Sequence, residues 1–320
     1  MEGYNFDDIM LVPRKCILQS RADADTSCKL GNRTFKIPLM PSNMPAILDE
    51  KLAVEFAKRN YFYVMHRYNV DAIEFSRKMR SLGLFVSISI GVKQESLDLV
   101  DKLKAENLVP EYITVDIAHG HSEQMHRTLE HIRKVMGNDT FIIAGNVATP
   151  EGLQDLENWG ADAVKVGIGP GYVCSTSIRT GFGTRKWQLA AIKNCAAAAK
   201  KTVIADGGCR QNSDIVKCIH GGADWVMSGY FYAGCTESPG KTIVKEDVVL
   251  KTYYGNASSE NKQSNHRVEG ISVHVPCRGS IFDKLEEIHQ DLQSAISYAG
   301  GTKMNDVRNC DCVFVRGSDG

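Results

Sequence analysis

The chain of 320 residues lacks an excess of charge of either sign. It has 38 lysines and arginines against 38 aspartates and glutamates, so its formal net charge at pH 7 is zero. A general binder of nucleic acid or of anionic membrane surfaces carries a clear basic excess. We therefore expect neither a nucleic-acid partner nor a membrane partner.

Long hydrophobic runs are absent as well. No stretch approaches the ~18 consecutive apolar residues of a transmembrane helix. Residues 1–8 are acidic and aromatic, unlike an export signal, so we expect a cytoplasmic protein. No linker rich in proline, glycine or serine divides the chain, and 43% of its residues are hydrophobic, enough for a large core. These features predict one catalytic domain over residues 1–320.

Cysteine and histidine are present, but without the spacing of a disulfide framework or a metal site. The ten cysteines are scattered, and a chain of this length does not need disulfides for stability. We expect reduced thiols, most of them buried. The spacing of His119, His121 and His126 does not place three ligands on one helical face, so we expect capping or solvated roles for them.

Short apolar runs alternate with amphipathic segments along most of the chain. Eight runs have the length and composition of buried strands: 37–40, 61–65, 85–90, 112–116, 141–144, 163–166, 202–205 and 225–227. Helical patterns lie at 72–82, 124–136, 187–200 and 285–296. Eight strand–helix units in this order predict an α/β protein with a (β/α)8 TIM barrel, and a doubly wound sheet is the alternative.

The alternation is interrupted once, between the eighth strand and the eighth helix. Residues 235–280 are rich in glycine, serine, asparagine, lysine and glutamate in an irregular order. A structureless insert of this length is usually a functional loop or a disordered one. In a barrel it would emerge at the carboxyl ends of the strands, so we interpret it as a flap over the active site, with inert decoration as the alternative.

A glycine-rich loop after the sixth apolar run carries a single cysteine. Residues 167–176 read GIGPGYVCST. Glycine and proline let the backbone turn sharply and expose its amides and carbonyls. A thiol held there is accessible and close to dipoles that favour the thiolate. Cys174 is therefore a candidate nucleophile and Thr176 a candidate proton relay. A tight turn with an incidental cysteine is the alternative.

Other polar and glycine residues follow the predicted strands, where barrels form their active sites. They include Ser42, Asn43, Asp116, Asp206, Gly207, Gly208, Gly229 and Tyr230. Glycine amides after the seventh and eighth strands suit a phosphate. The Asp206 carboxylate suits the two hydroxyls of a ribose, because it accepts two hydrogen bonds. Together with the thiol, this pattern suggests a nucleotide whose base is attacked, whereas ordinary turn glycines and a capping aspartate are the alternative.

Taken in order, the motifs resemble the IMP dehydrogenase/GMP reductase family over nearly the whole chain. They are MPSNM (40–44), DIAHG (116–120), AGNVAT (144–149), KVGIGPG (165–171) with Cys174, ADGG (205–208) and SYAGGTK (297–303). The regulatory insert usual in the dehydrogenases is absent after Tyr68, and residues 235–280 lack their Arg-Tyr pair. Val268-Glu269-Gly270 instead resembles the flap carboxylate of the reductases of bacterial type.

The resemblance implies an NADPH-dependent oxidoreductase of purine salvage that deaminates GMP to IMP and ammonia. Its intermediate would be a thioimidate between Cys174 and the purine, and Thr176 with Glu269 would relay protons. The alternatives are an IMP dehydrogenase without its regulatory insert and a non-catalytic purine-nucleotide sensor. No G-x-G-x-x-G opens a Rossmann unit, which fits a cofactor laid across the barrel mouth.

The resemblance also implies roles for individual residues. Substrate binding falls to Asp206, Gly207, Gly208, Gly229 and Tyr230, cofactor binding to Ser42, Asn43, Asp116 and Ala118, and a monovalent cation such as K⁺ to the carbonyls of Gly169 and Gly171. A homotetramer is implied as well. Two residues depart from the family pattern: Tyr172 stands where relatives often have serine, and Tyr230 where the dehydrogenases often have a second glycine.

Overall fold

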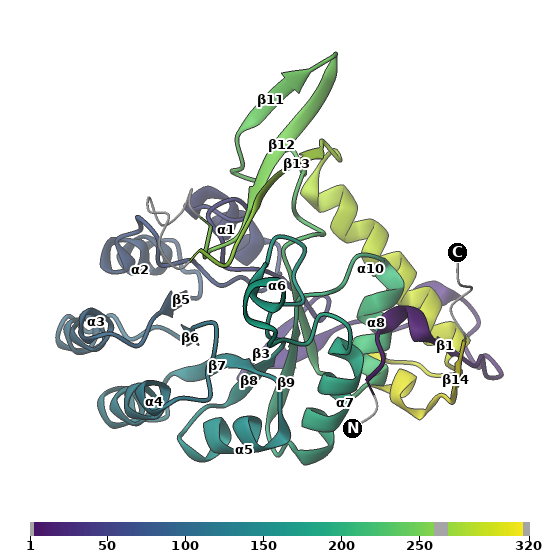
Figure 1. Ribbon diagram of the computed structural model, residues 1–320, viewed down its shortest axis with the longest axis horizontal. Helices are drawn as coiled ribbons and strands as arrows, with labels where there is room; N and C mark the ends of the chain where they lie inside the picture. Colours follow the sequence, from purple (N-terminus) through teal and green to yellow (C-terminus); the bar gives the residue numbers. More distant parts are fainter. Residues whose placement is uncertain (1–2, 259–267, 316–320) are drawn as a thin grey trace.

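The computed structural model describes residues 3–258 and 268–315, which fold around a curled parallel sheet (Figure 1). Its seven strands lie side by side in the order β4-β10-β9-β8-β7-β6-β5. In chain order they are β4 (Leu39–Pro41), β5 (Ser87–Ile90), β6 (Tyr112–Asp116), β7 (Phe141–Val147), β8 (Ala163–Val166), β9 (Thr202–Asp206) and β10 (Trp225–Ser228). Seven of the eight predicted strands are therefore confirmed.

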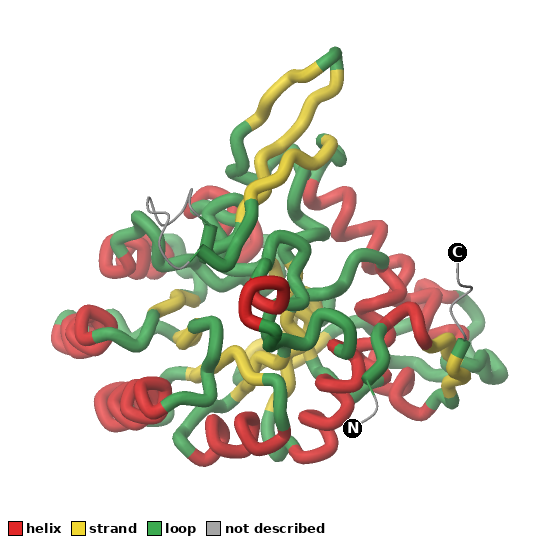
Figure 2. The backbone as a smooth tube through the Cα atoms, viewed as in Figure 1, coloured by secondary structure: helices red, strands yellow, loops and turns green. Residues whose placement is uncertain are grey.

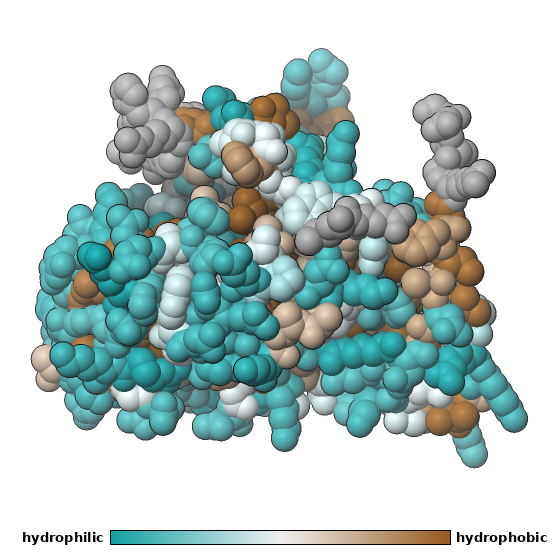
Figure 3. Space-filling model, turned by 60° about the horizontal axis from the view of Figure 1, so that its bottom comes forward, coloured by the Kyte–Doolittle hydropathy of each residue, from teal (hydrophilic) through white to brown (hydrophobic). Residues whose placement is uncertain are grey.

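Helices surround the sheet, as Figure 2 shows. They are α1 (Glu50–Lys58), α2 (Ala72–Ser81), α3 (Gln94–Ala105), α4 (Glu123–Met136), α5 (Pro150–Asn158), α6 (Thr176–Thr180), α7 (Gln188–Ala198), α8 (Asn212–His220) and α10 (Ile281–Tyr298). Long helices bury an apolar stripe, such as Leu285, Ile288, Leu292 and Ile296 of α10. The face in Figure 3 is mostly hydrophilic, with apolar residues gathered near its right-hand edge. The predicted TIM-barrel-like fold is confirmed.

The prediction of a strand at 61–65 is wrong in detail. Only Met65 pairs with its neighbour, as an isolated parallel bridge to Ile88 of β5. The segment is nevertheless buried, and the Phe62 ring lies 4.9 Å from the ring of Tyr112 and 5.8 Å from that of Trp225. Aromatic packing thus replaces a hydrogen-bonded ladder where the barrel closes between β5 and β4, which explains an apolar run without a strand.

The insert between β10 and α10 is more ordered than predicted. It contains an antiparallel sheet of β11 (Thr242–Lys245), β12 (Val248–Tyr254) and β13 (Ser272–Pro276), and the β11–β12 hairpin projects from the barrel (Figure 1). Glu246 and Asp247 form its two-residue turn, both with positive φ. Such turns usually carry Asn-Gly or Asp-Gly, so the hairpin had no strong signal in the sequence. Residues 259–267 of the predicted flap lie outside the described residues.

The ends of the described chain pair with each other beside the barrel. Strand β1 (Ile9–Leu11) is antiparallel to β14 (Cys312–Phe314), and a second small ribbon joins β2 (Cys28–Leu30) to β3 (Arg33–Phe35). Short 3-10 helices span Phe6–Asp8, Arg21–Asp23 and Met304–Asn309. Within residues 3–258 and 268–315, no helix combines the length and the apolar character needed to cross a bilayer.

Candidate active site

A cavity of about 370 Å³ opens at the carboxyl ends of the barrel strands. Its walls come from the loops after β4, β6, β8, β9 and β10 and from the flap, which is the arrangement expected of a barrel active site. The predicted site residues that line it are Ser42, Asp116, Ala118, Gly169, Gly171, Cys174, Thr176, Asp206, Gly207, Gly208, Gly229, Tyr230 and Glu269. Segments that are far apart in sequence therefore meet in one cavity.

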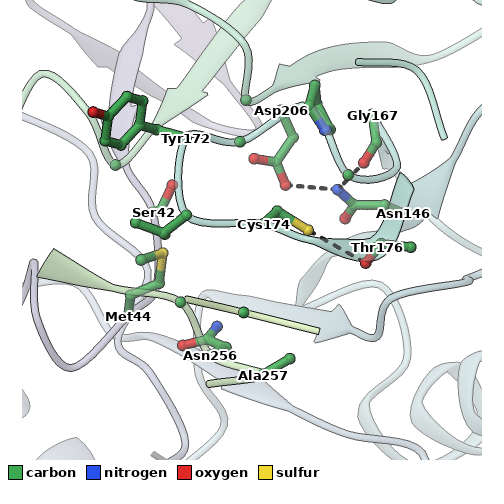
Figure 4. Close-up of a pocket in the computed structure, with 18 of the residues that line it drawn as sticks. Ser42, Met44, Asn146, Gly167, Tyr172, Cys174, Thr176, Asp206, Asn256 and Ala257 are labelled. Atoms are coloured by element: carbon green, nitrogen blue, oxygen red, sulfur yellow. Dashed lines mark hydrogen bonds between the residues drawn. The ribbon is translucent and has the colours of Figure 1, made fainter. Parts of the chain in front are cut away.

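Cys174, Thr176 and Glu269 form one hydrogen-bonded chain in this cavity. The Thr176 hydroxyl donates to Oε2 of Glu269 at 2.6 Å. It also lies 3.3 Å from the Cys174 sulfur (Figure 4). Because the single hydroxyl proton points to the carboxylate, the thiol is left as a donor. Its acceptors within reach are the threonine oxygen and, at 3.7 Å, the Glu269 carbonyl. Cys174 is partly exposed, so it is accessible to a ligand. The arrangement allows a proton to pass between the sulfur and the flap carboxylate.

Backbone hydrogen bonds hold the flap against the loop that carries the cysteine. The Ser175 amide donates to the Glu269 carbonyl at 2.8 Å, and the Ile271 amide donates to the Val173 carbonyl at 2.9 Å. Cys174 and Gly270 also form an antiparallel bridge. Glu269 is therefore positioned by main-chain contacts, which do not depend on its own side chain.

Close packing explains why glycine occupies positions 167 and 229, in the loops after β8 and β10. A Cβ on Gly167, whose φ is 145°, would lie 2.2 Å from the Asp206 carbonyl oxygen. A Cβ on Gly229 would lie 2.5 Å from the hydroxyl of Tyr253 on β12. Gly229 thus makes room for a flap residue, whose hydroxyl reaches the loop predicted to bind phosphate. Burial raises the pKa of Tyr253, which keeps its phenol protonated as a hydrogen-bond donor.

An aromatic cluster with two arginines borders the same end of the cavity. The rings of Tyr172 and Tyr230 lie 5.3 Å apart, and Arg210 and Arg278 stack over them at 5.1 and 4.3 Å respectively. Tyr172 and Tyr230, the two residues that depart from the family pattern, thus lie side by side. The arginines place positive charge beside the loops predicted to hold a phosphate.

The sequence reasoning missed Lys165, which lies beneath the cavity. This lysine on β8 is 1% exposed, and its Nζ contacts Asp116 Oδ1 at 2.5 Å and Asp206 Oδ2 at 3.0 Å. Burial opposes the charge on each group, but the ion pairing outweighs it, raising the pKa of Lys165 and lowering the pKa of Asp116. The available signal was a single lysine inside the apolar run 163–166.

Asn43 and Gly171 make contacts other than those expected of residues that only bind a ligand. Asn43 does not line the cavity: it is 3% exposed, and its side-chain amide donates to Asp116 Oδ2 at 3.0 Å. Its place is behind Asp116, where it orients that carboxylate. The carbonyl of Gly171, predicted to bind a cation with that of Gly169, accepts the Cys174 amide at 3.1 Å. A carbonyl has a second lone pair, so this bond still leaves room for a cation.

The histidines lie outside the cavity. His121 Nε2 lies 2.8 Å from Asp155 Oδ2, and the His126 ring stacks on Trp159 at 4.7 Å. In the described ranges, no group of three or more histidine, cysteine, aspartate or glutamate side chains is placed to hold a metal. These histidines make contacts within and between α4, α5 and the adjoining loop.

Comparison with known proteins identifies the family of this chain. Residues 3–319 match the model of the IMP dehydrogenase / GMP reductase domain. The chain belongs to this family. It is 54% identical to the GMP reductase of Bacillus subtilis (strain 168) over 316 residues, 98% of this chain and 97% of that protein. It is 48% identical to the GMP reductase of Mesoplasma florum over 319 residues, the full length of both. These IMP dehydrogenase/GMP reductase relatives match the chain without large insertions or truncations.

Proposed function

We propose that this protein is an enzyme that reduces GMP to IMP and ammonia with NADPH. The observation that carries the proposal is the Cys174–Thr176–Glu269 chain of hydrogen bonds inside the cavity. A thiol nucleophile linked to a carboxylate supplies both covalent attack and proton transfer. Relatives at 48–54% identity that carry the name GMP reductase support the same activity.

The proposed reaction begins with attack of the Cys174 thiolate on C2 of the purine, an electrophilic carbon between two ring nitrogens. The thiol proton passes to Thr176 and Glu269, along the 3.3 and 2.6 Å contacts. The C2 amine leaves as neutral ammonia only after protonation, and Glu269 through Thr176 is the general acid within reach. The covalent thioimidate then remains on Cys174, and its collapse after reduction expels the thiolate.

The groups around the cavity support a position for the substrate. Asp206 faces the ribose hydroxyls, and Gly207, Gly208 and Gly229 lie around the phosphate. The amides of Gly208 and Gly229 are its donors, because the Gly207 amide already donates to the Met227 carbonyl at 3.0 Å. The phenol of Tyr253 and the guanidiniums of Arg210 and Arg278 lie beside this end and can complement the phosphate charge. Tyr230 packs against this end of the cavity. This placement puts the purine beside Cys174, between the β8 loop and the flap.

The cofactor residues lie on another side of the cavity. Ser42, Asp116 and Ala118 line it together with Arg67, and Asn43 orients Asp116 from behind. Their donors and acceptors fit a nicotinamide with its ribose, and Arg67 adds positive charge toward a phosphate-bearing cofactor. When bound, NADPH supplies the hydride for C2.

We further propose that a monovalent cation binds the Gly169 and Gly171 carbonyls, and that the single barrel with its flap works as a homotetramer in the cytoplasm.

The deciding experiment compares two reactions of the purified protein by absorbance of the nicotinamide. We expect NADPH oxidation with GMP, and no NAD⁺ reduction with IMP. Reduction of NAD⁺ with IMP would instead indicate a dehydrogenase without its regulatory insert. Binding of GMP without either reaction would indicate a nucleotide sensor, and both outcomes contradict the proposal.

A further inference from the structure

Lys165 occupies an unusual place for a lysine, in the middle of a buried strand. Its neighbours in register are Gly145 on β7 and Ile204 on β9, and Gly145 is itself in register with Asp116 on β6. A Cβ on Gly145 would lie only 2.6 Å from the Cβ of Lys165. The missing side chain at 145 therefore opens the path by which Lys165 reaches across β7 to Asp116.

The ammonium of Lys165 is enclosed by protein. Besides the two aspartates, its only hydrogen-bond neighbour among the described residues is the Met227 sulfur at 4.0 Å, and Lys165 is not part of the cavity wall. A group so enclosed does not touch a ligand in the cavity. Its effect on a ligand must pass through Asp116 and Asp206, which both line the cavity.

Lys165 and Asn146 fix the orientation of the Asp206 carboxylate. Both donate to the same oxygen, Oδ2, at 3.0 and 2.8 Å. Figure 4 shows the bond from Asn146. Within residues 3–258 and 268–315, Oδ1 of Asp206 has no such donor. The amide oxygen of Asn146 is also buried without a partner there, while its nitrogen donates to Asp206 and to the Gly167 carbonyl. Oδ1 of Asp206, which lines the cavity, is thus left for a donor from a ligand.

We propose that Lys165 is the positioning residue that aims Asp206 at the vicinal hydroxyls of a ribonucleotide while it holds Asp116 on the cofactor side. The inference rests on the proposed function, which assigns the ribose to Asp206, and adds the group that orients this carboxylate. The free Oδ1 of Asp206, which has two lone pairs, accepts from the hydroxyls, and Lys165 holds both carboxylates in place. One buried cation thereby links the nucleotide side of the cavity to the cofactor side.

The test compares binding of GMP and of 2′-deoxy-GMP by calorimetry without cofactor. A hydrogen bond to a charged group predicts that the wild-type protein prefers GMP by roughly tenfold to a hundredfold. In Lys165→Met we expect that preference to fall to within about threefold, because Asp206 is no longer aimed. Lys217→Met is the matched control: Lys217 is also buried, but it donates to the Phe6 carbonyl away from the site. It should keep the full preference.

A merely structural role for Lys165 gives a different result. It would weaken both nucleotides equally and leave the preference unchanged, and that outcome overturns the inference while the proposed function stands. If circular dichroism shows that Lys165→Met does not fold, the double variant Lys165→Met/Asp116→Asn removes one unpaired carboxylate and is measured in the same way. A wild-type protein that binds no GMP overturns the proposed function and, with it, this inference.

Discussion

The hydroxyl of Thr176 donates a 2.6 Å hydrogen bond to the carboxylate of Glu269, although 93 residues separate them in the chain. The bond joins the first residue of α6 to the base of the flap. It depends on main-chain contacts on both sides, since Ser175 donates to the Glu269 carbonyl and the Glu269 amide donates to Ala257. The flap thus contributes a functional group to the site in addition to covering it.

Glu269→Gln removes the proposed proton donor and keeps the shape of the side chain. We expect kcat to fall by about 10²–10⁴, the usual contribution of general acid–base catalysis, and KM for GMP to stay within a few-fold. Steady-state NADPH oxidation measures both values. Glu246→Gln in the β11–β12 turn is the control and should behave like the wild type. Unchanged kcat in Glu269→Gln would remove this carboxylate from the mechanism.

Cys174→Ala removes the proposed nucleophile. We expect no measurable turnover, because no covalent intermediate can form, while GMP affinity in a direct binding titration stays within a few-fold. Cys277→Ala changes another exposed thiol, on the flap, and should keep full activity. Residual turnover by Cys174→Ala near that of the wild type would argue against covalent catalysis.

Gly229→Ala tests the close approach of the flap to the β10 loop. The new methyl carbon would lie 2.5 Å from the Tyr253 hydroxyl, so Tyr253 must move. We expect KM for GMP to rise about tenfold or more, with a smaller change in kcat, because the contact affects binding rather than chemistry.

Tyr253→Phe provides the matching double-mutant cycle. Without the hydroxyl, alanine at 229 meets the ring carbon Cζ at 3.3 Å rather than the oxygen at 2.5 Å. We expect KM of the double variant to be close to that of Tyr253→Phe alone. Strictly additive effects would show that the two residues do not interact.

Asp116→Asn breaks the buried ion pair with Lys165. The pKa of Asp116 is lowered in the folded protein, so its ionisation stabilises the fold above its ordinary pKa of 3.8 and this contribution is lost as pH falls through the lowered value. The pKa of Lys165 is raised, so its contribution is complete below 10.5 and is lost only at higher pH.

We therefore expect Asp116→Asn to lose about 3 kcal/mol of unfolding free energy at neutral pH. The difference should be constant from about pH 5 to 9 and shrink below about pH 4, as Asp116 of the wild type becomes protonated. Urea unfolding across this range measures it. Asp101→Asn, which removes an exposed partner of His131, should cost less than about 1 kcal/mol. A difference that grows at low pH would contradict the ion-pair account.

The order of strands and helices was predictable, because buried strands and amphipathic helices have local periodicity. The two segments that were predicted incorrectly also have local causes. Residues 61–65 are as apolar as a strand because aromatic packing buries them. The composition of a segment indicates that it is buried, but not that it pairs with a neighbouring strand. The β11–β12 hairpin turns at Glu246-Asp247, which lacks the glycine that usually marks such a turn.

By itself, the sequence determined the barrel class, the glycine-rich loop with Cys174 and the set of polar strand ends, because these are properties of neighbouring residues. Only the tertiary structure decided that Glu269 reaches Thr176, that Tyr253 crosses Gly229, and that Lys165 passes over Gly145 to join Asp116 with Asp206. These relationships depend on distances across the barrel, which arise only once the strands curl around a common axis. The Lys165 ammonium, buried beneath the cavity, thereby links the two aspartates that line it.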